Sequence, residues 1–498
     1  MKVQNSEKHA LDKTKLVINF NEGDVPSLHP HDLSSIVRGV TLCKYLYEGL
    51  TRLSLAGNYE LAGAEKVEQS PCGKFYTFTL RENYYSNGEP VTAFDYENFW
   101  KEALKAESKC PNAHLLYCIK NAEKAKKREL DLEQVGVKAL DDRTLSVELV
   151  EPCPYFLSLL SLPVFLPFKG EGPPLFNGPY SVEKWNKNDK IFLKSNPHFW
   201  DHSKIAIDNV EILMVQDVMA AFSLYEDGKI DWFGDPFCWL PSEILSNTLP
   251  NGRLSKGKDV MYPFWIYLNT EHFPLSSPLI RQALSSVISR NKISEHIFCG
   301  ESPLLTPIPH EVFGENAITD GDVEKGRDFF EKGLKELGLT KATFPPLTLS
   351  SSRMGSFRRL AEYLQETWQK ELGITVNLDI QEWGTFYANI VNGDYQAGGY
   401  FISSEYDDPL SCLETLSMAN NRPQWNHPRY QEIMSQLKSA TDPSRRKSLF
   451  REAQDILKNE MPVIWVVNKN QYYSYRKDLK GVCFDHQGSP DIRHAYFD

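Results

Sequence analysis

Hydrophobic and polar residues alternate most regularly over residues 74–80, where KFYTFTL places Tyr, Phe and Leu at every second position. A period of two is typical of a strand with one buried face. The turn-forming residues 86–90 follow, and Thr92 and Asp95 then have the spacing of a helix-capping pair. The pattern therefore predicts a strand, a turn and a helix that runs to about Lys105.

Apolar residues recur at helical spacing in two longer segments, 281–297 and 358–372. The second segment ends directly before Gly373, a usual helix cap, and the strand-like run 374–378 follows at once. Alternation of strands and helices predicts a mixed α/β architecture. The same reasoning predicts further strands at 16–20, at 177–180 and 191–196 as a pair, and a change of domain at 170–174.

The length and charge of the chain narrow the classes of protein that it can belong to. The chain has 498 residues. At about 150 residues per domain, this length predicts two to four domains. The net charge of −11 argues against general binding of nucleic acid, because phosphate contacts need an excess of Lys and Arg. Aromatic residues make up 12% of the chain, which suits a protein that packs flat rings around a ligand.

The first residues and the cysteines leave the cellular compartment open. Residues 1–15 are polar and have no apolar core of a signal peptide, and no run approaches the roughly 18 apolar residues of a membrane span. The sequence therefore fits a cytoplasmic protein or the mature part of an exported one. Nine cysteines with no CxxC pair speak against a zinc ribbon and indicate mainly buried thiols, and a bridge between Cys110 and Cys118 stays an alternative.

Motifs for nucleotide hydrolysis, dinucleotide binding, serine hydrolysis and zinc proteolysis are all missing from the sequence. His29 and His31 flank a proline, and His198 and His202 stand four apart, but neither pair has a neighbouring Cys or carboxylate at ligand spacing. We interpret both pairs as surface histidines. In an extended segment, however, His29 and His31 would point the same way, so a metal held by this pair stays an alternative. The sequence thus predicts no catalytic residue, no metal site and no cofactor.

Short motifs that follow one another along nearly the whole chain resemble one family. They are Pro26–Pro30, Tyr47–Thr51, Phe78–Arg81 with Ser86–Ala93, Asn177–Tyr180, Asn196–Trp200, Gly228–Asp231, Arg281–Leu284 with Arg290, and Glu460–Ile464. In this order they resemble the large extracytoplasmic solute-binding proteins of peptide ABC transporters, of the oligopeptide- and dipeptide-binding kind. His29 stands where that family usually has Asp.

The resemblance implies a two-lobed α/β fold of the type II periplasmic-binding-protein kind, with three domains and a hinge. Lobe I would comprise residues 1–43, 168–265 and 470–498, the inserted domain II residues 44–167, and lobe III residues 266–469. The hinge strands would cross near Tyr267–Asn269 and near Val467–Asn468.

The resemblance also implies how a peptide would be bound between the lobes, with its backbone paired to strands and its charged ends met by side chains. Glu405 aligns with the acid that grips the ligand's amino group, where Asp is usual. Arginines that meet the ligand's carboxylate in some members are replaced by residues 396–399, so Arg353 becomes the substitute candidate. Asp407 and Asp408 are interpreted as structural. The other expected ligand contacts are Gly399, where a ligand backbone can approach closely, and the aromatic walls Trp265, Tyr262, Trp383, Tyr400, Tyr117 and His114.

The function implied is that of a receptor, not an enzyme, which closes over a peptide and delivers it to the permease of an ABC importer. It would be a monomer in the periplasm or cell envelope, with a lipid anchor in the full-length precursor and no nucleic-acid partner. Alternatives are a receptor of the same fold for a cell-wall peptide, a glutathione-like peptide, nickel or haem, and a bilobed cytoplasmic hydrolase.

Overall fold

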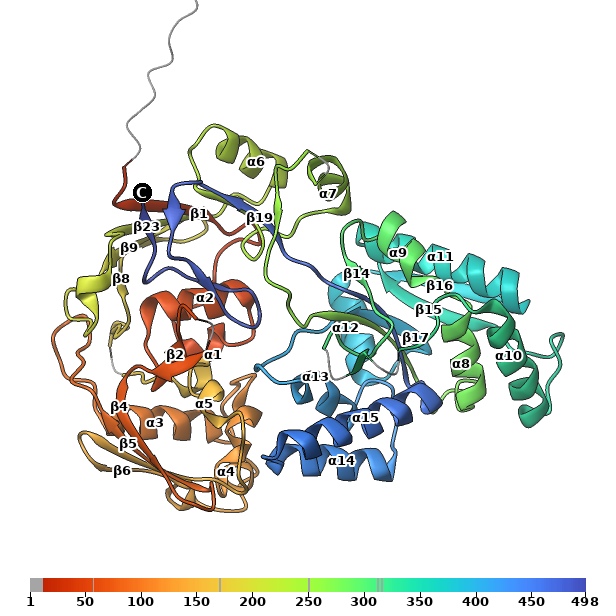
Figure 1. Cartoon of the computed structure of the whole chain (residues 1–498), viewed down its shortest axis with the longest axis horizontal. Coiled ribbons are helices and arrows are strands. Elements are labelled where there is room, and N and C mark those ends of the chain that lie inside the picture. Colours follow the sequence, from red (N-terminus) through yellow and green to blue (C-terminus); the bar gives the residue numbers. More distant parts are fainter. Residues whose placement is uncertain (1–11, 57, 170–171, 250, 311–312, 315–316) are drawn as a thin grey trace, which may run out of the picture. The chain divides into compact units, whose positions relative to one another are not determined.

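The computed structural model describes residues 12–56, 58–169, 172–249, 251–310, 313–314 and 317–498. The chain forms two compact units (Figure 1). Unit 1 comprises the described residues up to Leu240 together with Tyr472–Asp498, and unit 2 comprises Pro241–Gln471.

The expected boundaries of the three domains stay a prediction, beside which the divisions between the two units can be set. The second division, at 471/472, lies two residues from the expected 469/470, whereas the first, at 240/241, lies 25 residues before the expected 265/266. Helix α7 (Ser242–Thr248) explains the difference, because Ser242 Oγ donates to the Ile297 carbonyl at 3.1 Å and Glu243 pairs with Arg359 at 2.6 Å. These contacts fasten α7 to unit 2.

The first sheet of unit 1 has the strand order β1-β10-β9-β8, with β1 parallel to β10 and the other neighbours antiparallel. Its inward side chains join helix α2 (Val37–Leu46) in the main hydrophobic core of the unit. The strands are β1 (Lys15–Asn19), β8 (Tyr180–Asn186), β9 (Lys190–Ser195) and β10 (Asn209–Leu213). The expected strand at 16–20 and the expected strand pair are therefore confirmed.

A second, separate sheet of unit 1 is wholly antiparallel, in the order β4-β5-β7-β6, and helix α3 (Ala93–Leu104) packs beside it (Figure 1). Its strands are β4 (Ala64–Gln69), β5 (Phe75–Leu80), β6 (Val137–Asp141) and β7 (Thr144–Glu148). The Asp95 carboxylate accepts from the Thr92 backbone N–H at 2.7 Å and from its hydroxyl at 3.1 Å. This capping box begins α3 where the sequence predicts it.

Short elements complete unit 1. Strand β11 (Trp232–Gly234) pairs antiparallel with β19 (Tyr472–Tyr475), so the end of the chain returns to the unit that holds its beginning. The remaining elements are α1 (Pro30–Leu33), β2 (Thr51–Leu53), β3 (Tyr59–Leu61), η1 (Ala113–Cys118), α4 (Ala122–Lys126), η2 (Leu132–Gln134), α5 (Phe156–Leu159), η3 (Pro163–Phe165), η4 (His202–Lys204), α6 (Val218–Glu226), β20 (Leu479–Lys480), β21 (Cys483–Phe484), β22 (Pro490–Asp491) and β23 (Tyr496–Phe497).

Unit 2 is built on a six-stranded sheet of order β14-β18-β13-β17-β15-β16. Every residue of β13, β17 and β18 is buried, as expected for central strands covered by helices on both faces. The strands are β13 (Pro263–Leu268), β14 (Ser302–Pro303), β15 (Leu347–Ser352), β16 (Val376–Gln381), β17 (Ala397–Phe401) and β18 (Val463–Asn468); the short β12 (Ser255–Lys256) also belongs to this unit.

In unit 2, one helix predicted from the sequence is confirmed, and a second predicted helix is divided into two. Helix α11 (Gly355–Leu372) ends at Gly373 with φ of 72°, as predicted. The expected helix over 281–297 is instead α8 (Pro278–Ser286) and α9 (Arg290–His296), because the Asp320 carboxylate accepts from the Arg290 N–H at 2.7 Å and starts a new helix. The others are α10 (Val323–Leu337), α12 (Trp383–Asn392), α13 (Leu410–Leu413), η6 (Glu414–Leu416), α14 (Pro428–Ser439) and α15 (Pro443–Glu460).

The structure bears on two questions that the sequence raises, a disulfide bridge and a membrane-spanning helix. Cys110 and Cys118 are both reduced thiols, so the alternative of a bridge between them is wrong. Among the described residues, none of the helices combines the length and the apolar composition that a membrane crossing requires.

Candidate ligand-binding site

The carboxyl ends of three strands meet at one edge of the sheet in unit 2. Strand β15 is parallel to both β16 and β17, with Leu349 opposite Leu378 on one side and Ala397 on the other. The residues that follow these strands are Arg353, the pair Glu382 and Trp383, and the segment 402–405. In open α/β sheets, ligands bind outside the carboxyl ends of the strands, so this edge is the candidate site.

The amino end of β13 lies at the same edge, because β13 runs antiparallel to β17. The Ile402 N–H donates to the Pro263 carbonyl at 2.9 Å, and the Ser404 N–H donates to the Met261 carbonyl at 3.2 Å. Tyr262 therefore lies beside the segment that leads to Glu405, and its half-buried ring stands 5.6 Å from that of Phe401.

Glu405 is half-buried and stands just before α13. Its backbone N–H donates to Ser411 Oγ at 2.7 Å, which fixes the course of the loop. Burial, with the added charge of Glu405 and Glu414, raises the pKa of the Cys412 thiol. A carboxylate held on an ordered loop at the carboxyl edge of a sheet can meet an ammonium group.

Two acids, Asp407 and Asp408, follow Glu405 and have different surroundings. Asp408 accepts from the Leu410 N–H at 2.9 Å and pairs with Arg446, which agrees with its interpretation as a structural residue. Burial raises the pKa of Asp408 although Arg446 opposes this. Asp407 is exposed.

A group of aromatic rings forms an apolar surface next to this edge. Trp383 and Tyr387 stack along α12 with ring centres 5.8 Å apart, and Tyr400 meets both rings at 6.2 and 5.4 Å. Trp383 and Tyr387 are 42% and 41% exposed, which leaves two large rings in contact with solvent, whereas Tyr400 is only 7% exposed. Tyr387 was not predicted, although its position four residues after Trp383 is the spacing that brings two rings together on a helix.

Two arginines supply positive charge in this region. Arg422 Nε donates to the Tyr400 hydroxyl at 3.1 Å, an interaction that joins residues distant in sequence and leaves no motif. Arg353, the predicted partner of a ligand carboxylate, is exposed and forms an ion pair with Glu382 at 2.6 Å. A ligand carboxylate would therefore compete with Glu382 for Arg353.

Two predicted contact residues serve the interior of unit 2 instead. Trp265 is fully buried, and its indole N–H donates to the Pro307 carbonyl at 2.7 Å, so it belongs to the core rather than to an exposed wall. A Cβ atom on Gly399 would lie 2.1 Å from the Trp265 carbonyl oxygen. The close approach of β13 is sufficient to require glycine there, so the expectation of Trp265 as an exposed wall residue is corrected, while contact of a ligand with Gly399 stays a prediction.

Tyr117 and His114 both lie in η1 of unit 1 and are half-buried. Burial raises the pKa of Tyr117. Their contact with a ligand stays a prediction.

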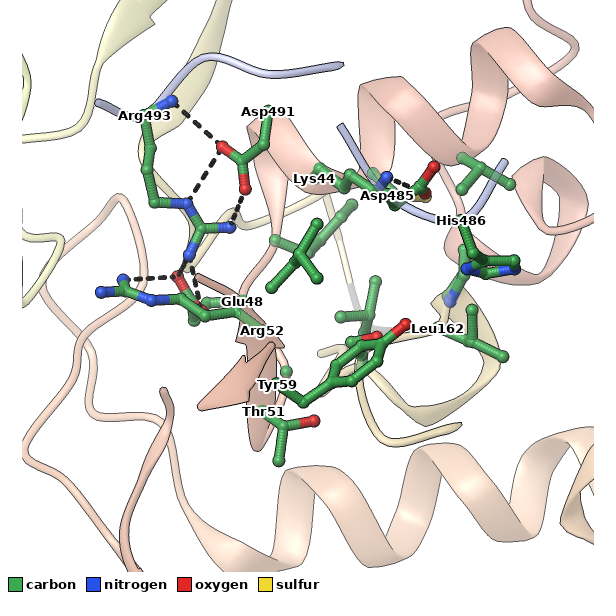
Figure 2. A pocket seen from close by; sticks show the side chains of 18 residues that line it. Lys44, Glu48, Thr51, Arg52, Tyr59, Leu162, Asp485, His486, Asp491 and Arg493 are labelled. Carbon is green, nitrogen blue, oxygen red and sulfur yellow. Dashed lines mark hydrogen bonds and ion pairs between the residues drawn. The ribbon is translucent and has the colours of Figure 1, made fainter. Parts of the chain in front are cut away.

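Unit 1 contains a pocket whose lining includes residues of a buried ion network (Figure 2). Both oxygens of Glu48 accept from Arg493 Nη1 at 3.1 Å, and Asp491 pairs with the same guanidinium at 2.8 Å. Arg52 approaches Glu48 to 3.8 Å and donates to Asp201 at 3.0 Å. Burial opposes the charge of Arg493, but Asp491 and Glu48 outweigh it and raise its pKa. The Tyr47–Thr51 motif thus supplies an acid that joins the start of the chain to its end.

The arrangement of unit 2, a mixed sheet with an acid, aromatic rings and arginines at the carboxyl ends of three parallel strands, defines a ligand-binding protein of the periplasmic-binding type. The chain belongs to the bacterial extracellular solute-binding proteins, family 5, whose family model (described as "family 5 Middle") matches residues 58–424.

Relatives of known name and structure agree with this assignment. The chain is 33% identical to the oligopeptide-binding protein OppA of Bacillus subtilis, over 99% of this chain and 95% of that protein. It is 30% identical to the dipeptide-binding protein DppE of the same organism, over 90% and 86%. The substrate-binding domain of an oligopeptide ABC transporter from Bacillus anthracis has a similar structure, with a TM-score of 0.80 at 25% identity over 98% of this chain and 99% of that one. The predicted family and α/β fold are confirmed.

Proposed function

We propose that the protein is the substrate-binding receptor of an ABC importer and that its ligands are peptides. The observation that carries this proposal is the near full-length similarity to an oligopeptide-binding protein. The family consists of binding proteins for transport, and the candidate site offers groups that suit binding: an acid, aromatic rings and arginines.

In this proposal, each group at the candidate site contacts a particular part of the peptide. Glu405 neutralises the ammonium end of the peptide. Without such a partner, moving this charge out of water would cost several kcal/mol of binding free energy. Trp383 and Tyr387 provide rigid, partly exposed rings against which peptide side chains pack. Arg422 and Arg353 are the cations offered to the peptide carboxylate, and Tyr262, Tyr400, Tyr117 and His114 complete the predicted contacts.

The partners and location follow from the same proposal. The loaded receptor delivers its peptide to the permease subunits of the importer, acts as a monomer outside the cytoplasmic membrane, and is held there by a lipid anchor on its precursor.

Mass spectrometry of the ligand released when the purified protein is denatured tests the ligand class directly. We expect peptides, and calorimetric titration of the refolded protein with the identified sequences should give one site. Recovery of haem or stoichiometric nickel would favour the metal- or haem-carrying alternative, and muropeptides would narrow the ligand to cell-wall fragments. Hydrolysis of a bound peptide on prolonged incubation would contradict a receptor.

Trp383→Ala is expected to weaken peptide binding by more than about 1 kcal/mol, or about fivefold, because aromatic residues that contact a ligand often dominate its affinity. The change should cost little stability, since 42% of the side chain is exposed. Calorimetric titration measures the affinity. Phe273→Ala is the control, because Phe273 is 52% exposed and follows β13 at the opposite edge of the sheet. An equal loss in both variants would remove Trp383 from the site.

A further inference from the structure

Two histidines and a glutamate from different parts of unit 1 converge beside helix α1. His29 caps α1, His31 lies in its first turn, and Glu102 comes from the last turn of α3. His29 Nε2 lies 3.6 Å from Glu102 Oε1. One potential ligand atom from each of the three residues lies within 4.8 Å of the other two.

His31 is not the surface histidine that the sequence predicts. Its side chain is 4% exposed and stacks on Phe99 with ring centres 3.9 Å apart. Its Nε2 atom is buried and has no hydrogen-bond partner among the described residues. A buried polar atom without a partner costs free energy, so a ring nitrogen held in this way is unexplained by the fold alone.

We propose that His29, His31 and Glu102 bind a divalent transition-metal ion of the zinc class. Two imidazole nitrogens and one carboxylate oxygen form a ligand set that Zn²⁺ accepts, with the fourth position left to water. Ligand atoms about 2.0–2.2 Å from a tetrahedral ion lie roughly 3.3–3.6 Å apart. The His29–Glu102 separation of 3.6 Å already meets this condition. The distances from the His31 ring nitrogen to the other two ligand atoms need to shorten by at most roughly 1.5 Å to complete the set, given the 4.8 Å limit on them.

A metal ion at this site would replace the proton that His29 carries on Nε2. His29 Nδ1 accepts from the His31 backbone N–H at 3.3 Å, which places the ring proton on Nε2, facing Glu102. On binding, the ion takes the Nε2 lone pair, that proton leaves to water, and Nδ1 takes up a proton from water. The contact from the His31 N–H is then released, and at 3.3 Å it is long enough to be weak.

The cluster is open to ions from solvent, because the side chains of His29 and Glu102 are 27% and 41% exposed. A bound ion would link the segment before α2 to helix α3. The thermal stability of unit 1 should therefore increase with ion concentration, as it does for any ligand that binds only the native state.

The test uses full-length protein without a histidine tag, stripped of metal with a chelator and titrated with Zn²⁺. We expect one equivalent to bind, with a rise in the unfolding temperature. Co²⁺ in its place should give the visible absorption of a four-coordinate ion. Glu102→Gln and His29→Gln should each weaken binding at least about tenfold, since even second-shell changes at metal sites cost 10- to 100-fold.

His296→Gln is the matched control, because His296 Nε2 lies 3.7 Å from Glu295 in an exposed pair that has no second imidazole. Its zinc affinity should equal that of the unchanged protein. Failure to bind one equivalent, unchanged affinity in both Glu102→Gln and His29→Gln, or an equal loss in His296→Gln would each overturn the proposal. Peptide binding does not enter these measurements, so they test the metal site independently of the proposed function.

Discussion

Replacement of Arg493 by methionine is expected to lower the free energy of unfolding of unit 1 by about 3–5 kcal/mol. Arg493 is 4% exposed and faces Glu48 and Asp491, which are 1% and 4% exposed. Without the guanidinium, the cation left beside Glu48 in the described part of the chain is Arg52 at 3.8 Å, so a carboxylate stays buried with a distant partner. Breaking a buried pair from one side is costly for this reason.

Calorimetric unfolding measures the loss, with Lys127→Met as the control. Lys127 pairs with Glu123 at 2.7 Å on an exposed helix of the same unit, where a pair contributes about 0–1 kcal/mol. The double variant Arg493→Met, Glu48→Gln should recover part of the loss, because one of the two buried carboxylates that lose the guanidinium is then uncharged. A loss no greater than that of Lys127→Met would show that the buried network does not stabilise unit 1.

The same variant should also respond to pH in a defined direction. Burial already raises the pKa of Glu48, against the pull of Arg493 and Arg52. Without Arg493 the folded state should take up a proton on Glu48 more readily than the unfolded chain does. Stability then falls as pH rises, so the loss measured at about pH 5 should be smaller than at about pH 8.

Local signals in the sequence predicted local structure well. The Thr92 and Asp95 pair begins α3, and Gly373 ends α11, because capping depends only on residues a few positions apart. The segment 281–297 shows the limit of such signals. Its apolar spacing continues across the break between α8 and α9. Ser289 caps α9 from within the segment, but Asp320, which also accepts from the first turn of α9, lies far along the chain.

The candidate site was predictable in its motifs but not in the surroundings of each side chain. The sequence places Trp383 and Trp265 equally well on an aromatic wall, yet one is exposed and the other fully buried. Burial depends on which elements cover a residue, and one sequence does not contain that information. Arg422 and Glu102, which lies beside His29, were missed for the same reason, because both reach their neighbours only through the tertiary fold.

The acid at the carboxyl edge of unit 2 carries the strongest functional prediction. Glu405→Gln is expected to weaken the binding of peptides with a free amino end by about 2–5 kcal/mol, at least about 30-fold, because an ammonium loses its charged partner while keeping a group of the same shape. The fold should be unaffected, since the described loop contact to Ser411 comes from the backbone N–H of Glu405. Calorimetric titration with one peptide in its free and N-acetylated forms measures the effect.

The two forms of the peptide separate charge recognition from other contacts. The acetylated peptide has no ammonium, so its weaker binding should be the same in Glu405→Gln and in the unchanged protein. Asp407→Asn is the matched control, because Asp407 is an exposed acid two residues further along the same loop. If Glu405→Gln binds the free peptide normally, or if Asp407→Asn loses as much affinity, Glu405 does not hold the amino end and the recognition of that end must be assigned to another residue.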